Sequence, residues 1–218
     1  MEEELVRYKG IIFDLDGVVV STDDCHYDAW KQLANEEEIY FDREINQRLR
    51  GVSRMESLEI ILEKAKKEYS DDEKEKMAER KNSYYKNLIK KLDESAILDG
   101  AVDFIKRAKS KGIKVAIGSS SKNTNTILKQ VGIYDMFDAI ADGNDIKKSK
   151  PAPDVFLIAA ERLNIMPKDC LVVEDADAGV EAALAAGMEV LAVGYASSNL
   201  KANYQAKGLF DSSAIAVL

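Results

Sequence analysis

Residues 11–18 read Ile-Ile-Phe-Asp-Leu-Asp-Gly-Val. The three apolar residues predict a short strand that is buried on both faces and ends at two carboxylates. Asp14 and Asp16 are two positions apart, so on a strand they project from the same face and repel each other unless a cation or a proton separates them. Gly17 allows a sharp turn, which leaves the Asp14 carboxylate and the Asp16 carbonyl oxygen free to face one divalent metal ion. A strand followed by an ordinary Asp-Gly turn explains the same residues, so this motif alone does not decide between the two.

The second half of the chain alternates between helical patterns and short apolar runs. This alternation begins near Gly100 and predicts a parallel sheet with helices on both faces, the arrangement of an α/β, Rossmann-like fold. After the first strand, further strands are expected at residues 113–117, 138–141, 170–173 and 188–193. Helices are expected between them, at residues 154–163 and 179–186 among others.

The segment after the first strand carries only helical patterns. Ser53 and Ser70 each precede a Glu by three residues, which is the capping-box signature of a helix start. We therefore expect two domains. Residues 1–20 and 96–218 would form the α/β core, and residues 21–95 would form an inserted all-helical cap domain.

Composition excludes several classes of function. The formal net charge of -8 argues against a nucleic-acid-binding surface, because a phosphate backbone requires a basic face. Cys25 and Cys170 lack the spacing of a metal site and are expected to be free thiols. No apolar run is long enough to span a bilayer, and the acidic start of the chain is unlike a signal peptide. A cytoplasmic monomer without membrane or nucleic-acid partners is therefore expected.

Three later loops place polar groups at expected strand ends, where ligands bind in open parallel sheets. Residues 118–123 read Gly-Ser-Ser-Ser-Lys-Asn and lead into a helix, so their hydroxyl and N–H groups could hold phosphate oxygens or simply cap that helix. Lys150 precedes a Pro-Ala-Pro turn, which could hold its amine inward, although lysine runs are usually solvated. Glu174 and Asp175 could be metal ligands or merely acids at a helix start, and Asp177 is expected to cap that helix.

As a set and in this order, the four loops resemble the haloacid dehalogenase-like hydrolase superfamily. Its signature is a DxDG strand end, a Ser/Thr loop, a lysine and a final acidic pair, which match DLDGV, SSSKN, SKPAPD and VEDADAG here. The helical insertion is similar to the cap of the β-phosphoglucomutase subgroup. Thr22, His26, Trp30 and residues 49–54 match that subgroup's cap motifs.

The resemblance implies a role for each matched residue. Asp14 would be the nucleophile that attacks a phosphoryl group, and Asp16 the general acid/base. Mg²⁺ would be held by Asp14, the Asp16 carbonyl and Asp175, with Glu174 nearby. Ser119 and Lys150 would bind the transferring phosphoryl group, and His26 would couple cap closure to proton transfer. The expected substrate-binding residues are Thr22, Trp30, Arg50, Gly51, Val52, Arg54, Ser121, Lys122 and Asn123.

Two of these cap residues have a simpler explanation, and one departs from the subgroup. His26 could be a partly buried helix residue, and Trp30 could belong to the cap core. Arg50 stands where the subgroup commonly has a lysine, and a planar guanidinium fork is not equivalent to a point charge. Arg54 is the natural residue to grip a second, non-transferring phosphate.

The resemblance implies an isomerase that interconverts β-D-glucose 1-phosphate and glucose 6-phosphate. The expected route passes through an aspartyl-phosphate enzyme and a glucose 1,6-bisphosphate intermediate. One alternative is a phosphatase that hydrolyses small sugar phosphates with the same residues. A more remote alternative is a non-catalytic regulator that binds phosphosugars. The pairing of Asp14 with Asp16 argues against that regulator, because binding alone requires no nucleophile and proton donor.

Overall fold

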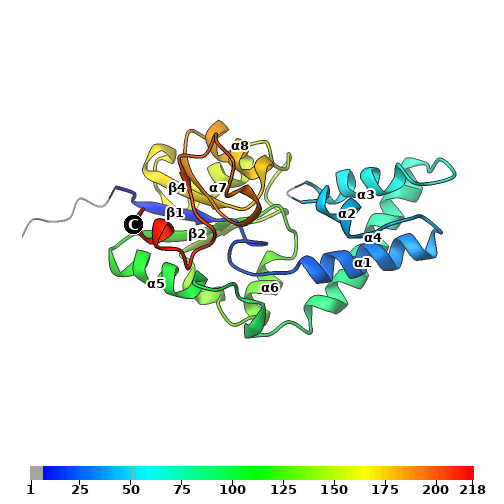
Figure 1. Cartoon of the computed structure of the whole chain (residues 1–218), viewed down its shortest axis with the longest axis horizontal. Coiled ribbons are helices and arrows are strands. Elements are labelled where there is room, and N and C mark those ends of the chain that lie inside the picture. Colours follow the sequence, from blue (N-terminus) through cyan, green and yellow to red (C-terminus); the bar gives the residue numbers. More distant parts are fainter. Residues whose placement is uncertain (1–6, 51) are drawn as a thin grey trace, which may run out of the picture.

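The centre of the computed structural model, which describes residues 7–50 and 52–218, is a six-stranded parallel sheet (Figure 1). The strand order is β3-β2-β1-β4-β5-β6, so β1 lies in the middle and pairs with both β2 and β4. In this register Phe13 faces Ile117 on one side and Val173 on the other. The strands are β1 (Gly10–Phe13), β2 (Lys114–Gly118), β3 (Ala139–Ala141), β4 (Cys170–Glu174), β5 (Glu189–Ala192) and β6 (Tyr204–Gln205).

Helices cover both faces of the sheet, which confirms the predicted fold class. Side chains alternate along each strand, so Ile11 and Phe13 pack in one apolar cluster with α5 and α6, while Ile12 packs in another with α7 and α8. Every β1 residue is buried, as expected for a central parallel strand. The core helices are α5 (Ala101–Ser110), α6 (Thr124–Gln130), α7 (Asp154–Leu163), α8 (Asp177–Ala185) and α9 (Ser212–Ile215).

A group of four helices lies to one side of the sheet and contains an apolar cluster of its own (Figure 1). Trp30, Phe41 and Leu58 are among its buried residues. Both predicted capping boxes are present, because the Ser53 and Ser70 hydroxyls accept hydrogen bonds from the N–H groups of Glu56 and Glu73. The helices are α1 (Asp23–Glu36), α2 (Arg43–Gln47), α3 (Arg54–Leu62) and α4 (Asp71–Ile89).

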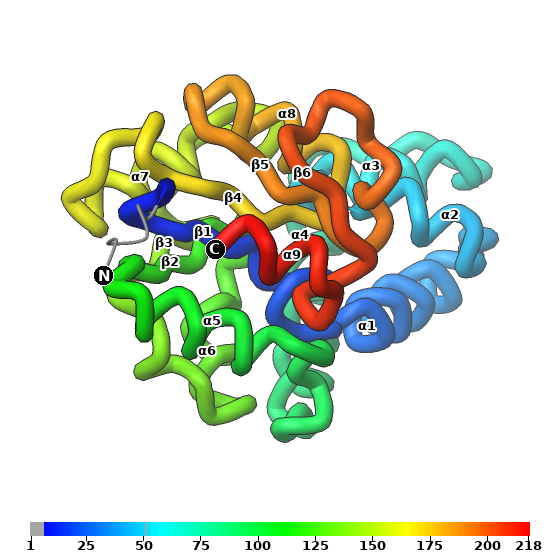
Figure 2. Tube along the Cα trace, turned by 60° about the vertical axis from the view of Figure 1, so that its left-hand side comes forward, coloured from blue at the N-terminus to red at the C-terminus, as the bar shows by residue number. Residues whose placement is uncertain are grey.

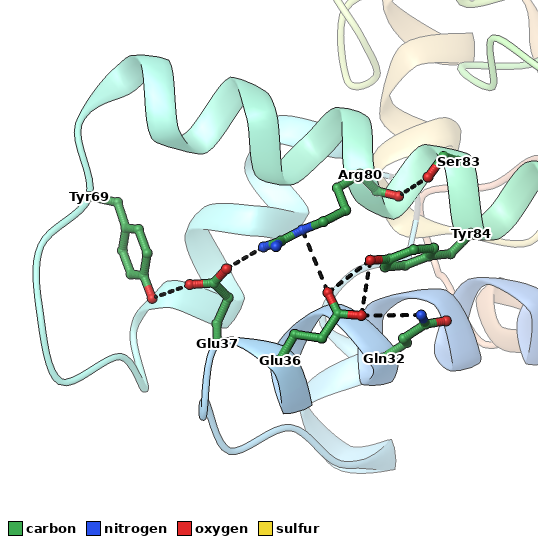
Figure 3. Close-up of polar contacts among 7 residues, drawn as sticks. All are labelled: Gln32, Glu36, Glu37, Tyr69, Arg80, Ser83 and Tyr84. Carbon is green, nitrogen blue, oxygen red and sulfur yellow. Dashed lines mark hydrogen bonds and ion pairs between the residues drawn. The ribbon is translucent and has the colours of Figure 1, made fainter.

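A polar network fastens the far end of α1 to α4 (Figure 3). Arg80 on α4 pairs with Glu37 and lies 3.6 Å from Glu36, and both acids sit at the C-terminal end of α1, where the helix dipole disfavours negative charge. Tyr84 and Tyr69 donate to Glu36 and Glu37, respectively. The network therefore compensates two unfavourably placed carboxylates and fixes α4 against α1.

The two segments that join the helical insertion to the sheet run side by side. Val20 forms an antiparallel bridge with Ile97, and the Ser21 N–H donates to the Ala96 carbonyl over 2.8 Å. This pairing lies next to the boundaries at residues 21 and 95 that the sequence predicts for the cap domain. The division into two domains at these residues stays a prediction.

The structure corrects three local expectations. Asp177 does not cap α8 but is its first residue and accepts a hydrogen bond from Asn199, while the N-cap is Ala176. Thr22 has the residue type of a helix cap and occupies the N-cap position of α1, but its side chain makes no capping bond there. The two-residue strand β6, which lies beside β5 at the sheet edge, was not predicted from the sequence (Figure 2). Among residues 7–50 and 52–218, no helix has the length and apolarity required to span a bilayer.

Candidate active site

A cavity of about 720 Å³ lies between the carboxyl ends of the strands and the helical insertion. It brings together nearly all of the residues that the sequence analysis proposed for the site. Thr22 does not line it, and Gly51 lies outside the described residues. The proposed residues on its wall are Asp14, Asp16, His26, Trp30, Arg50, Val52, Arg54, Ser119, Ser121, Lys122, Asn123, Lys150, Glu174 and Asp175.

The floor of the cavity is a buried cluster of one lysine and two carboxylates. Lys150 Nζ lies 2.5 Å from Asp14 Oδ1 and 2.5 Å from Glu174 Oε1, and the lysine side chain is only 2% exposed. Burial opposes the charge of this amine, but Asp14 and Glu174 outweigh burial and raise the pKa of Lys150 above its ordinary value. The lysine is therefore held inward as a permanent cation, and the interpretation of residues 147–150 as only a solvated turn is wrong for Lys150.

Together with the neighbouring Asp175, the two carboxylates of this floor suit a divalent metal ion. Oxygen atoms of Asp14, Glu174 and Asp175 all lie within 4.8 Å of one another, and all three residues are buried. Burial raises the pKa of Asp175 well above its usual range and, despite Lys150, raises that of Glu174 too, and the charges of the neighbouring carboxylates add to both shifts. Carboxylate oxygens are the ligands that Mg²⁺ prefers. The donor set therefore fits a hard divalent cation.

Within this acidic cluster, the hydrogen bonds separate two roles. Both oxygens of Glu174 are engaged, since Oε1 accepts from Lys150 and Oε2 accepts from the Ala176 N–H over 2.8 Å. Among the described residues, by contrast, the only ion pair of Asp175 joins its Oδ2 to Nη1 of Arg50 over 3.8 Å. Asp14 and Asp175 are therefore better placed to bind a cation directly, while Glu174 orients Lys150.

Asp16 is held by Thr22, the residue at the N-cap of α1. Thr22 donates its hydroxyl to Asp16, and Tyr85 in turn donates to Thr22 over 3.1 Å. Burial raises the pKa of Asp16 to about 7, the Thr22 hydrogen bond opposes this shift, and the charge of Asp14 adds to it. A carboxyl group with a pKa near neutrality can both donate and accept a proton, which is what general acid/base catalysis requires.

A second cluster of polar side chains, formed by Asn82, Arg54 and Asn123, also lines the cavity. Asn82 of α4 accepts hydrogen bonds from Arg54 over 3.0 Å and from Asn123 over 3.2 Å, so one asparagine connects α3 with the loop that follows β2. The hydroxyls of Ser119 and Ser121 accept bonds from their own loop, each over 3.2 Å. This loop therefore offers a preformed, polar wall that includes both serines and Asn123.

His26 forms a pair with the buried Lys81, of which only His26 was predicted from the sequence. Lys81 Nζ lies 2.9 Å from His26 Nδ1, and Lys81 is 2% exposed. Burial lowers the pKa of Lys81 to about 7 and lowers the pKa of His26 well below its usual value. The nearby charge of Arg54 lowers both pKa values further. Lys81 Nζ lies 4.6 Å from the centre of the Trp30 ring, and Trp30 belongs to the apolar cluster of the helical insertion as well as to the cavity wall.

The comparison with protein families matches residues 8–187 to haloacid dehalogenase-like hydrolases. The chain belongs to the haloacid dehalogenase-like hydrolase family. It is 43% identical over 197 residues to a β-phosphoglucomutase of Bacillus subtilis, covering 89% of this chain and 87% of that protein. It is 31% identical over 184 residues to a phosphorylated carbohydrates phosphatase of Thermotoga maritima, covering 83% and 82%. A solved β-phosphoglucomutase structure from Clostridium difficile superposes with a TM-score of 0.87 at 41% identity, covering 93% and 92%.

In this member of the haloacid dehalogenase-like hydrolase family, Gly17 makes the close approach of two acids possible. It has a φ of 82°, and a Cβ at this position would lie 2.1 Å from Asp175 Oδ2. We expect Gly17→Ala to displace Asp175 and lower the affinity for Mg²⁺ by at least about tenfold, because L side chains avoid this backbone region and Asp175 is a candidate ligand. Isothermal titration with Mg²⁺ measures this. Gly112→Ala is the matched control, since it has a φ of 78° and nothing within 4 Å of an added Cβ. Equal affinities in the two variants would contradict the expectation.

Lys81, Asn82 and Tyr85 are the residues on this site that the sequence analysis missed. All three lie on α4, whose sequence is rich in charged residues and therefore does not by itself point to a buried face. A signal was nevertheless present, because Met77, Lys81 and Tyr85 are spaced four residues apart and therefore share one face of the helix. A lysine inside such an apolar stripe marks a buried cation.

Proposed function

We propose that this chain is a Mg²⁺-dependent β-phosphoglucomutase that interconverts β-D-glucose 1-phosphate and glucose 6-phosphate. The observation that carries this proposal is that one cavity holds two groups suited to phosphate. One group of residues contains Asp14 and Lys150, and the other contains Arg54 and Asn123. The two similar β-phosphoglucomutases, at 43% and 41% identity, support the same function.

The reaction would begin with attack by an Asp14 carboxylate oxygen on phosphorus. The bond to the sugar oxygen breaks, and the phosphoryl group becomes an acyl phosphate on Asp14. Lys150 lowers the repulsion between this carboxylate and the incoming phosphate, since it lies 2.5 Å from Asp14 Oδ1. Ser119 and Lys150 would bind the phosphoryl oxygens during transfer. Mg²⁺ bound by Asp14 and Asp175, with the Asp16 carbonyl as a third ligand, would supply positive charge at the transferring group.

Asp16 would move the proton in both half-reactions. As the sugar oxygen leaves, protonated Asp16 donates its proton to that oxygen. In the second half-reaction the ionised Asp16 removes a proton from the attacking hydroxyl. The phosphoryl group then passes to that hydroxyl oxygen, which restores the free Asp14 carboxylate. Thr22 would orient Asp16 through its hydrogen bond, so we assign Thr22 to positioning rather than to direct contact with the sugar.

The second phosphate-binding cluster of residues explains how one sugar could react at both ends. Glucose 1,6-bisphosphate carries two phosphates, and Arg54 with Ser121, Lys122 and Asn123 would hold whichever phosphate is not reacting. A guanidinium suits this task because it grips phosphate with two parallel hydrogen bonds. Release, rotation and rebinding of the bisphosphate would then present the other end to Asp14. We propose that the enzyme acts as a cytoplasmic monomer on this phosphosugar.

The product distribution tests this function. Purified enzyme with Mg²⁺, β-glucose 1-phosphate and a trace of glucose 1,6-bisphosphate should form glucose 6-phosphate faster than inorganic phosphate. Release of inorganic phosphate without glucose 6-phosphate would overturn the mutase assignment. It would support the sugar-phosphate phosphatase, which the 31% identity to the Thermotoga maritima phosphatase keeps as a second candidate.

The pKa of Asp16 predicts opposite pH dependences for the two half-reactions. Because that pKa is about 7, transfer of phosphate from the bisphosphate to Asp14 should be constant below pH 7 and fall about tenfold per pH unit above it. Transfer from Asp14 to a sugar hydroxyl needs ionised Asp16, so it should rise up to pH 7 and then level off. Rapid-quench measurements of each step test this. Parallel profiles for the two steps would contradict the dual role of Asp16.

A further inference from the structure

Arg50 makes contacts that span from the helical insertion to the sheet core. Its guanidinium carbon lies 3.8 Å above the centre of the Tyr195 ring, and Tyr195 follows β5 in the core. Its Nη1 lies 3.8 Å from Asp175 Oδ2, and its Nη2 forms an ion pair with Asp23 at the start of α1. One side chain therefore links the insertion, the first helix and the acidic cluster.

The stack on Tyr195 depends on the planar shape of the arginine. A guanidinium lies flat on an aromatic ring, whereas a lysine ammonium is a compact point charge. Tyr195 is 66% exposed and is therefore not needed to fill the core. The Tyr195 ring is therefore a surface that holds the guanidinium of Arg50 beside Asp175.

Two cavities meet at this contact. A smaller cavity of about 400 Å³ shares Arg50, Asp175 and Ala176 with the active-site cavity, and Tyr195 lines only the smaller one. Arg50 thus forms part of the partition between them. If the guanidinium moved away, the two cavities would join beside Asp175, and water would gain a second route to the carboxylates.

We propose that the Arg50–Tyr195 stack is a positioning device that closes this second route and so protects phosphorylated Asp14 from hydrolysis. This inference rests on the proposed function, because a mutase must exclude water while the bisphosphate turns around. Asp23 holds the guanidinium from the insertion side, and Tyr195 holds it from the core side. Neither Arg50 nor Tyr195 needs to touch the transferring phosphoryl group for this effect.

The lifetime of the phosphorylated enzyme tests the proposal directly. The enzyme is phosphorylated by acetyl phosphate with Mg²⁺, freed of donor, and followed without any sugar acceptor. Tyr195→Leu should shorten the lifetime about threefold to tenfold, because it removes the aromatic face that holds the guanidinium. Arg50→Lys should act in the same direction, since it keeps the charge but loses the planar stack. Tyr195→Phe is the matched control and should retain the wild-type lifetime.

The outcomes distinguish this proposal from the proposed function. An unchanged lifetime in Tyr195→Leu would overturn the role of the stack. If only Arg50→Lys shortened the lifetime, the effect of Arg50 would come from its contacts with Asp23 and Asp175 and not from the stack, which would also overturn the proposal. Failure of the wild-type enzyme to form glucose 6-phosphate would overturn the mutase but leave the lifetimes to decide on the stack. A wild-type enzyme that forms no phosphoenzyme would overturn both.

Discussion

Replacement of Asp14 by asparagine should lower the rate of glucose 6-phosphate formation by at least about 10³-fold. The reason is chemical, because an amide has the shape of the carboxylate but not its nucleophilic oxygen. Binding of glucose 1,6-bisphosphate should persist, since Lys150 keeps its 2.5 Å contact with Glu174. The second phosphate-binding cluster, which contains Arg54, is also unchanged. Steady-state kinetics with coupled detection of glucose 6-phosphate measures the rate, and calorimetric titration with glucose 1,6-bisphosphate measures the binding.

Asp135→Asn provides the matched control for this substitution. Asp135 is exposed, lies in the short 3-10 helix Tyr134–Met136 and does not line the cavity. The same change of charge there should leave both turnover and binding at wild-type values. Radiolabel from the bisphosphate should appear on the wild-type and control proteins but not on Asp14→Asn. Labelling or full turnover of Asp14→Asn would contradict the covalent mechanism.

The parts of the structure that the sequence predicted well are those fixed by local chemistry. The first strand, the helix at residues 154–163 and both capping boxes follow from apolar patterns and from hydrogen bonds between residues three apart, and the structure confirms them. The meeting of Asp14 and Asp175 was predictable for a further reason. Neighbouring parallel strands end at the same edge of a sheet, so acids at those ends converge.

The parts that the sequence did not predict depend on contacts between distant segments. Thr22 has the residue type of a helix cap, but its hydroxyl is used by Asp16, and nothing in the local pattern indicates that competition. Lys81 is buried against His26 because α1 and α4 pack together, and their contact is invisible in either helix alone. The stack of Arg50 on Tyr195 joins residues that are 145 positions apart along the chain.

Removal of the buried amine should have the second large effect, and it should act on folding as well as on catalysis. Lys150→Met should lower the free energy of unfolding by about 3 to 5 kcal/mol near pH 8, because it leaves Asp14 and Glu174 buried without their cation. The rate of glucose 6-phosphate formation should also fall, since the methionine cannot bind phosphoryl oxygens. Urea unfolding followed by the fluorescence of Trp30, the sole tryptophan, measures the stability.

The pH dependence of this loss identifies its cause. Burial raises the pKa of Glu174, Lys150 opposes that shift, and removal of the lysine should raise this pKa further. The folded variant then holds a proton that the unfolded chain releases above about pH 4.5, so the stability of the variant falls as pH rises. In the wild type, Lys150 has a raised pKa, and its contribution is therefore constant from pH 5 to pH 8. The deficit should be smaller at pH 5 than at pH 8.

A second substitution separates the charge of Lys150 from its packing. In Lys150→Met with Glu174→Gln, only one buried carboxylate of the pair remains, and the glutamine can still accept from the Ala176 N–H. The double variant should therefore recover much of the lost stability near pH 8 while remaining inactive. Equal stabilities of the single and double variants at pH 8 would mean that lost packing, and not two unpaired carboxylates, causes the deficit. Since Lys150 also lies 4.7 Å from the Phe156 ring, the comparison distinguishes these two contributions.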